Sequence, residues 1–297
     1  MSSMEIICNV CQAKVERVLL DWGNNPVMRC EKCGLVFRKV VVDLSEEELF
    51  DLAMTVGDAF KSPTAKYDAS YREDDIRVIL WEKFLEELDR FKLSERRKLL
   101  DIGAAKGVFL DIARKRGWKP MGIEPSEEDS SYAREVFKLP IFTGTLEEAK
   151  LPSNQFDAAT MLDVIEHLKN PSETVAEAFR VLKPGGILLV FTPNHDSLIF
   201  LISHWLYRLS LGKFPLERLY PVVHVHYFTP RALSYLLRKS GFNIEWLGSG
   251  PLHPGKCLTS TKIIRVGAST LEFLSKPLHR RYRIAIIGSK PLSSESE

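Results

Sequence analysis

A glycine-bearing turn between two apolar stretches is the part of this sequence best suited to hold a ligand. It lies within residues 98–112, where a short apolar run, a turn containing Gly103 and Gly107, and apolar residues at helical spacing predict a strand, a tight loop and a helix. Glycine permits backbone conformations that side chains forbid, so the loop N–H groups and the helix N-terminus can approach a bound molecule closely. The Gly-x-x-x-Gly spacing departs from the Gly-x-Gly-x-x-Gly pattern that seats a pyrophosphate.

A carboxylate downstream of this turn narrows the choice of ligand. Glu124 ends the next predicted strand, at residues 119–124. A carboxylate at that position can accept hydrogen bonds from both hydroxyls of a ribose. A ribose site without a pyrophosphate site points to S-adenosylmethionine. Either feature alone is compatible with an ordinary strand–helix connection, so the prediction rests on their order and spacing.

Four of the five cysteines form two Cys-x-x-Cys pairs, Cys8 with Cys11 and Cys30 with Cys33. This spacing lets each pair hold one tetrahedral metal ion from its own turn and predicts a zinc ribbon in residues 1–44. A redox dithiol or two disulfides is the alternative, which a reducing cytosol disfavours. Because so short a segment cannot build a sufficient core, the metal would supply its folding energy.

Beyond residue 98 the pattern alternates between strands and helices, which is typical of a parallel sheet covered on both faces. We expect strands at residues 119–124, 139–143, 156–162, 187–192, 244–247 and 282–288, and helices at 45–56, 72–91, 126–137, 171–182 and 230–240 and near Leu271. Lys183 to Gly186 is expected to form a turn. The predicted organisation is a zinc ribbon at 1–44, a helical linker or cap at 45–97, a main domain at 98–290 with an insertion at 196–228, and a disordered tail at 291–297.

The amino-acid composition does not identify a binding partner. Lys plus Arg total 41 against 39 Asp plus Glu, a net charge of +2, which does not make nucleic acid or an anionic membrane an obligatory partner. No signal peptide or long apolar span is recognisable, so we expect a cytoplasmic protein. The hydrophobic run at 198–211 is interpreted as core or lid packing, with a membrane-surface helix as the alternative.

The stretch Leu99-Leu-Asp-Ile-Gly-Ala-Ala-Lys-Gly resembles motif I of the class I S-adenosylmethionine-dependent methyltransferases. It is followed in the family's order by Gly122-Ile-Glu-Pro-Ser, Gly144-Thr-Leu-Glu-Glu, Phe156-Asp, Leu162-Asp-Val-Ile-Glu-His-Leu, Leu182-Lys-Pro-Gly-Gly and Thr192-Pro-Asn. The resemblance covers residues 98 to 290 and is greatest to the ubiquinone-biosynthesis-like branch that carries an N-terminal zinc ribbon. It implies an α/β fold with a doubly wound, Rossmann-like, mostly parallel sheet of seven strands, the last one antiparallel.

The resemblance also implies roles for individual residues. The methionine end of the cofactor would lie against Asp101, Gly103, Ala104 and Gly107, the ribose against Glu124 and the adenine between Thr145 and Leu146, and Asp163 would close the site. The sequence departs from the family at Ala105, where a second glycine is usual. An added Cβ is tolerable there if the residue keeps a negative φ.

Three histidines are candidate general bases, namely His167, His224 and His226; for His167 a purely structural role is an equal alternative. A base is needed only for a hydroxyl acceptor or to deprotonate an amine or carbon acid. Asp163-x-x-Glu166-His167 also resembles the Glu-x-x-Glu-His set with which ubiquinone O-methyltransferases and small-RNA 2′-O-methyltransferases hold a divalent cation. His224 or His226 would be a fourth ligand, and the metal would lower the pKa of an acceptor hydroxyl.

The predicted function is transfer of a methyl group from S-adenosylmethionine to an oxygen, nitrogen or carbon atom of a small molecule or a glycan. One alternative is an RNA methyltransferase that grips RNA with its zinc ribbon, against which the weak basic bias of residues 5–40 counts. The other is a non-catalytic module in which cofactor or zinc serves assembly with a partner protein.

Overall fold

A computed structural model describes residues 5–22, 26–39, 70–71, 75–91, 97–209, 216, 219–221, 223–250 and 262–292, without the side chains of residues 76 and 262–268. The predicted helix at 45–56, most of the predicted linker and the last five residues of the predicted tail lie outside the described residues.

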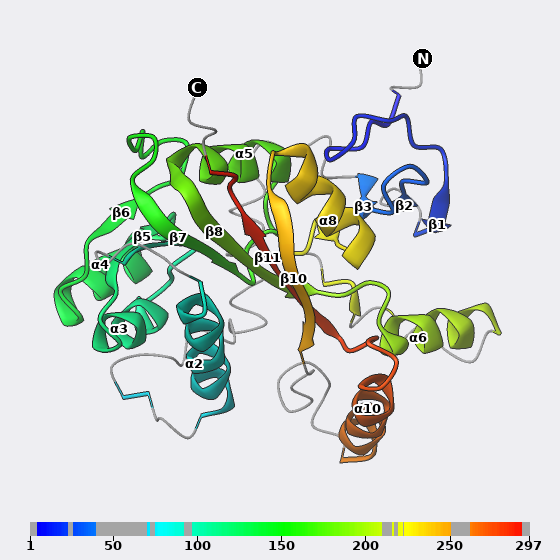
Figure 1. Ribbon diagram of the computed structural model, residues 1–297. Coiled ribbons are helices and arrows are strands. Elements are labelled where there is room, and N and C mark those ends of the chain that lie inside the picture. The colour runs from blue at the N-terminus through cyan, green and yellow to red at the C-terminus, as the bar shows by residue number, and fades with distance from the viewer. Residues whose placement is uncertain are drawn as a thin grey trace.

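The main domain is built on a seven-stranded sheet of order β10-β11-β8-β7-β4-β5-β6 (Figure 1). Its strands are β4 (Lys98–Ile102), β5 (Lys119–Glu124), β6 (Ile141–Thr143), β7 (Phe156–Leu162), β8 (Leu182–Pro193), β10 (Asn243–Gly250) and β11 (Arg283–Ser289). Neighbouring strands are parallel except at β11, which is antiparallel to both β8 and β10. The predicted doubly wound sheet is therefore confirmed.

Helices cover both faces of this sheet because its central strands are apolar on both sides. On β8, Leu189 and Phe191 face a core with α2 (Ile76–Asp89), α3 (Val108–Lys115) and α4 (Glu127–Val136). Leu188 and Val190 alternate with them and face α5 (Pro171–Val181) and α8 (Pro230–Lys239). The two-residue period of the strand thus divides the core into two layers.

The segment from Lys183 to Gly186 differs from the prediction, since it lies within β8 instead of forming a separate turn. Phe156 pairs with Leu182 and Ala158 with Ile187, so the register shifts across this segment. Gly185 has a φ of 76°, and its N–H donates to Lys290 O. The extra residues form a bulge in β8 that needs glycine at position 185. A hydrogen bond to Lys290, which follows β11, holds this bulge.

A second, four-stranded sheet is formed at the N-terminus by β1 (Val18–Leu20), β2 (Val27–Arg29) and β3 (Val36–Arg38). Its fourth strand, β9 (His226–Tyr227), comes from the predicted insertion and is antiparallel to β3. The end of the predicted insertion therefore adds a strand to the N-terminal sheet.

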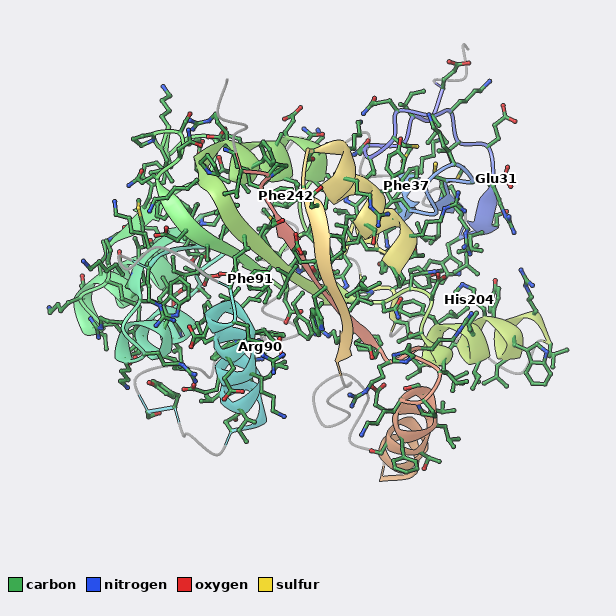
Figure 2. The ribbon with its side chains drawn as sticks, in the orientation of Figure 1. Glu31, Phe37, Arg90, Phe91, His204 and Phe242 are labelled. Carbon is green, nitrogen blue, oxygen red and sulfur yellow. The ribbon has the colours of Figure 1, made fainter. Side chains whose placement is uncertain are left out.

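Two further helices, α6 (Leu198–Arg208) and α10 (Lys262–Ser275), contact each other and extend away from the large sheet (Figure 1). His204, labelled in Figure 2, lies on α6, and Phe37 lies on β3 of the N-terminal sheet.

Candidate functional site

A cavity opens where the carboxyl ends of β4, β7 and β8 meet α2 and α3. Side chains from α2, the loop after β4, α3 and the ends of β7, β8 and β11 line it, namely Arg77, Leu80, Trp81, Asp101, Gly103, Ala104, Ala105, Lys106, Val108, Phe109, Leu162, Asp163, Phe191 and Arg283. Open α/β sheets bind ligands at this edge.

The loop after β4 has glycine where only glycine fits. Gly103 has a φ of 77°, and a Cβ added there would lie 2.4 Å from the Cγ2 of Val164. Gly107 has a φ of 79° at the N-cap of α3, and its added Cβ would lie 2.8 Å from the Cδ1 of Leu139. Of these two, Gly103 lines the cavity, whereas Gly107 fixes the start of the helix behind it.

Ala105 does not keep the negative φ that the sequence analysis required of it. Its φ is 45°, in the left-handed region, which costs an L-residue other than glycine about 1–2 kcal/mol. The backbone N–H of Ala105 donates to the Oε2 of Glu124 at 2.8 Å. This hydrogen bond to a buried carboxylate helps to hold the alanine in the disfavoured conformation.

Glu124 is 8% exposed at the end of β5, and its two oxygens hold two loops together. Its Oε1 accepts from Ser126 N at 2.8 Å, and its Oε2 from Ala105 N. Burial raises the pKa of Glu124 to about 6, although both hydrogen bonds act in the opposite direction. A carboxylate offers about four lone-pair sites, so Glu124 keeps acceptor capacity.

Asp101 is the buried acid of the cavity wall. It is 3% exposed, and its Oδ1 lies 2.6 Å from the Oγ1 of Thr160 on the neighbouring strand. Burial raises the pKa of Asp101 to about 8, with a smaller contribution from the charge of Glu124. At neutral pH its protonated form is therefore the more populated one.

Thr145 and Leu146 do not line the cavity. Leu146 is 1% exposed in the core on the other face of the sheet. The backbone N–H of Thr145 donates to the Oε2 of Glu148 at 2.7 Å, and its Oγ1 lies 3.3 Å from Glu148 N. Both residues follow β6, beyond the strand that ends at Glu124.

Asp163 lines the cavity and has a φ of 62°. Its Oδ2 lies 3.5 Å from the Nη2 of Arg77, and its Oδ1 contacts the Nη1 of Arg283. Sequence reasoning missed both arginines. Arg77 lies in a predicted helix and Arg283 in a predicted strand, and no motif relates positions so far apart.

Among the predicted histidines, His167 and His224 lie together with Glu166, their ligand atoms all within 4.8 Å of one another. The ring centroids of the two histidines are 4.8 Å apart, and the Nδ1 of His167 is 2.8 Å from Val223 O. Burial lowers the pKa of both histidines. His226 is outside this group, with its ring near those of Phe37 and Phe228.

The structure separates Asp163 from Glu166 and His167. Glu166 is 1% exposed, and its Oε2 accepts from the Oγ1 of Thr192 at 2.8 Å. Burial raises the pKa of Glu166 to about 7. Because Thr192 and Phe191 are consecutive in β8, they face opposite sides of the sheet, and Phe191 lines the cavity. Among the described residues, no histidine lines it.

The four N-terminal cysteines are buried and brought together as the spacing predicts, with no disulfide between them. The Sγ atoms of Cys8 and Cys33 are 3.6 Å apart, and those of Cys11 and Cys30 are 3.4 Å apart. Tetrahedral zinc with Zn–S bonds of about 2.3 Å requires sulfur atoms about 3.8 Å apart. The contact between Cys8 and Cys33 lowers the pKa of Cys8 to about 5 and raises the pKa of Cys33, and burial raises the pKa of Cys11 to about 11. The donor set is compatible with zinc.

The sequence and the structure both have recognisable relatives. A family model described as a methyltransferase domain matches residues 71–246. A probable S-adenosylmethionine-dependent methyltransferase of Mycolicibacterium smegmatis is 34% identical over 99 residues, which cover 33% of this chain and 38% of that protein. A ubiquinone biosynthesis O-methyltransferase of Methylococcus capsulatus is 27% identical over 193 residues, covering 61% and 77%.

Two solved structures share the fold. A SAM dependent methyltransferase from Archaeoglobus fulgidus superposes with a TM-score of 0.53 at 20% identity, covering 80% of this chain and 99% of that one. The [4+2]-cyclase SpnF superposes with a TM-score of 0.57 at 18% identity, covering 84% and 97%. No helix in the described part of the chain is both long and apolar enough to cross a membrane. Since the family model matches more than half of the sequence, the chain belongs to the methyltransferase domain family.

Proposed function

We propose that the protein transfers a methyl group from S-adenosylmethionine to a small-molecule or glycan acceptor. The observation that carries this proposal is the joining of Glu124 to the glycine turn. Its buried carboxylate is not itself part of the cavity lining, but it accepts from the N–H of Ala105, which lines the cavity, and retains acceptor capacity. Two similar proteins are named as an S-adenosylmethionine-dependent methyltransferase and a ubiquinone biosynthesis O-methyltransferase, and the alignments span 38% and 77% of their lengths.

The residues present fit the cofactor. Gly103 leaves the loop open where a Cβ would meet Val164, and Glu124 can accept from a ribose diol. We assign the methionine end to the cavity lined by Asp101, Gly103, Ala104 and Asp163 and the ribose to Glu124, with Gly107 setting the start of α3. The predicted adenine contacts, Thr145 and Leu146, lie outside this cavity. The cofactor supplies an electrophilic methyl group, and the chain orders the cofactor and positions the nucleophile.

Two metal sites are part of the proposal. Cys8, Cys11, Cys30 and Cys33 would hold a structural zinc ion. Glu166, His167 and His224 offer a carboxylate and two imidazoles, which would suit a divalent cation, in place of the predicted set that included Asp163. Without a metal, burial lowers the pKa of both histidines, which keeps their imidazoles neutral and makes them weak proton acceptors.

The proposal is tested by calorimetric titration with S-adenosylhomocysteine, the product form of the cofactor. Wild-type protein should bind it, and Glu124→Gln should weaken binding about tenfold or more, because an amide replaces one of two acceptor oxygens by a donor. Glu127→Gln is the matched control, since Glu127 lies on α4 and pairs with Arg134 at the surface. No binding by the folded wild-type protein, or equal binding by both variants, would contradict the proposal.

Turnover separates the proposed function from its two alternatives. Release of S-adenosylhomocysteine with a panel of phenols, catechols and sugars supports the small-molecule acceptor. Binding to RNA with a steep salt dependence would favour the RNA enzyme. Against RNA, Lys14 and Arg17 of the N-terminal unit pair with Glu5 and Glu31. Cofactor binding without turnover on any acceptor would favour the non-catalytic module.

A further inference from the structure

The large sheet ends on one side in a long strand. Its edge strands are β6, which has three residues, and β10, which has eight. Proteins protect edge strands from pairing with other chains by keeping them short or by placing lysine or proline in them. β10 is long and has neither residue, and in the described part of the chain it pairs with β11 alone. Its outer backbone N–H and C=O groups can therefore pair with a further strand.

A groove lies between this edge strand and α8, which packs beside β10 (Figure 1). Six residues of α8 line it together with Leu247 of β10, which is 47% exposed. Its volume is about 760 Å³, in the range of ligand-binding sites. A peptide that adds to an edge strand beside a helix presents every second side chain to that helix. The groove thus has the place and the size for an added strand.

The charges of the groove are all positive. Arg231, Arg238 and Lys239 are exposed on α8, and among the described lining residues there is no carboxyl group. Arg231 donates to Lys32 O and Lys239 to Val10 O, both at 2.7 Å. These bonds attach the cysteine-bearing segment to α8, but a carbonyl is neutral and leaves each charge uncompensated. No ion pair joins the three cations to a carboxylate elsewhere in the described ranges.

The two faces of an added strand would meet different surroundings. From Trp246 to Gly250 the pairing of β10 with β11 is regular, so Trp246 and Leu247 face opposite sides of the sheet. Leu247 faces α8 and its cations. Trp246 is 36% exposed, and its ring covers Gly248, where an added Cβ would lie 2.1 Å from the indole Cη2. One face of the strand would thus meet positive charge and the other an indole ring.

We propose that the groove between α8 and β10 binds an extended acidic segment of a partner protein, which adds to β10 as a further strand. Main-chain hydrogen bonds to β10 would supply affinity, and carboxylates on one face would pair with Arg231, Arg238 and Lys239. Apolar residues on the other face would cover Trp246. None of the groove residues lines the cofactor cavity, so this interaction does not depend on the proposed function.

The first test uses the full-length protein and a labelled peptide with blocked termini, in which glutamate and valine alternate over the length of β10, eight residues. Fluorescence anisotropy measures the affinity. This peptide should bind about tenfold or more tightly than one with glutamine in place of glutamate, and high salt should reduce the difference. In the complex, amide hydrogen exchange should slow in β10 and stay unchanged in β6, the other edge strand.

Two variants of the protein test the role of the cations. Arg238→Glu should lower the affinity for the acidic peptide about tenfold or more, because it reverses a charge of the groove. Lys119→Glu makes the same charge change at an exposed position at the start of β5 and should bind as wild type does. Thermal unfolding verifies that both variants fold. If Arg238→Glu does not, Arg238→Gln replaces it and should lower the affinity about threefold or more.

Two N-methylated peptides test the strand pairing itself. In an extended peptide the amides of all glutamates point to one edge and those of all valines to the other. Methylation of the set that faces β10 removes its donors and should lower the affinity about tenfold or more. Methylation of the other set should change it by less than about threefold.

Several results would overturn the inference. Equal affinity for the acidic and the neutral peptide would do so, as would wild-type binding by the variant of Arg238. Equal binding of the two N-methylated peptides would exclude strand addition. A dimer whose β10 amides are already protected without peptide would place a second copy of this chain at the edge instead of an acidic partner.

Discussion

At the scale of single residues, one carboxylate connects the turn after β4 with the start of α4. Glu124 accepts from Ala105 N on one side and from Ser126 N on the other, and the side chain of Ser126 accepts from Asp129 N to cap α4. The sequence identified Glu124 from its place at a strand end. It did not reveal the φ of Ala105, because that conformation depends on a hydrogen bond to a residue of the next strand.

The pH dependence of cofactor affinity should follow the ionisation of Glu124. Its pKa of about 6 is raised by burial, and ribose hydroxyls are better donors to the ionised form. Affinity for S-adenosylhomocysteine should therefore increase about tenfold between about pH 5 and pH 7 and level off above. Asp101, with a pKa of about 8, stays protonated over most of this range.

The stability of the ligand-free protein should change in the opposite direction. A carboxyl group whose pKa is raised by folding stabilises the fold below its unfolded pKa, and this contribution is lost as the pH rises through about 6. Over the same pH range, calorimetric titration measures the affinity for S-adenosylhomocysteine and denaturant unfolding measures the stability. In Glu124→Gln both profiles should be flatter, and an affinity profile in this variant identical to that of the wild type would show that another group titrates.

At the scale of elements, local periodicity predicted strands well and long-range pairing poorly. The strands predicted at 119–124 and 156–162 became β5 and β7 with these bounds. The strand β9 has only two residues, too few to show a hydrophobic pattern, and it pairs with β3 far back in the sequence, Val36 with Tyr227 and Phe37 with His226. No rule based on neighbouring residues could have placed it there.

Loss of the metal should therefore destabilise β9 as well as the cysteine site. In Cys33→Ser we expect a loss of about one zinc ion per chain, measured by elemental analysis, because a four-thiolate site loses a ligand. Amides of β3 and β9 should exchange faster with deuterium, since Val36 and Phe37 pair with Tyr227 and His226. The amides of β4 should stay protected from exchange.

Cys257→Ser is the matched control for this substitution, because Cys257 belongs to neither Cys-x-x-Cys pair. It should retain the zinc content and the exchange rates of the wild type. Unchanged zinc content in Cys33→Ser would contradict the assignment of the four thiols as a metal site. Zinc loss with unchanged exchange at β9 would contradict the coupling between the two segments.

At the scale of the whole molecule, the cavity and the N-terminal unit lie on different sides of β8. The family's motifs predicted the glycine turn and the carboxylate of Glu124 because both directly follow or end a strand, so a local sequence pattern marks them. The arginine pair around Asp163 was not predictable, since α2 and β11 meet only when the sheet is complete. The group of Glu166, His167 and His224 likewise depends on the insertion folding back onto the segment that follows β7.

We infer from the exposed apolar side chains of α6 and α10 that these helices contact an anionic membrane surface. Leu201, Trp205 and Leu209 are exposed along one side of α6 and its end, four residues apart, and Trp205 is 60% exposed. Around α10 the exposed large apolar residues are Phe273, Leu274 and Leu278, with Phe273 77% exposed, and exposed cations flank both helices at Arg208, Lys276 and Arg280. The carboxylate of Glu272 is buried and paired with Arg281. An apolar face with flanking cations is the pattern of an interfacial helix.

We therefore expect the protein to sediment with vesicles of phosphatidylcholine and phosphatidylglycerol, and less with phosphatidylcholine alone or at high salt, because both apolar burial and charge contribute. The double substitution Leu201→Ser and Trp205→Ser should lower the partition coefficient about tenfold or more, since burying one such side chain contributes about 1.5–3 kcal/mol. Val136→Ser, at an exposed apolar position on α4, should leave partitioning unchanged. If the wild-type protein stays in solution with both vesicle types, this face does not bind membranes; equal losses in both variants would show that general surface hydrophobicity, and not this face, drives sedimentation.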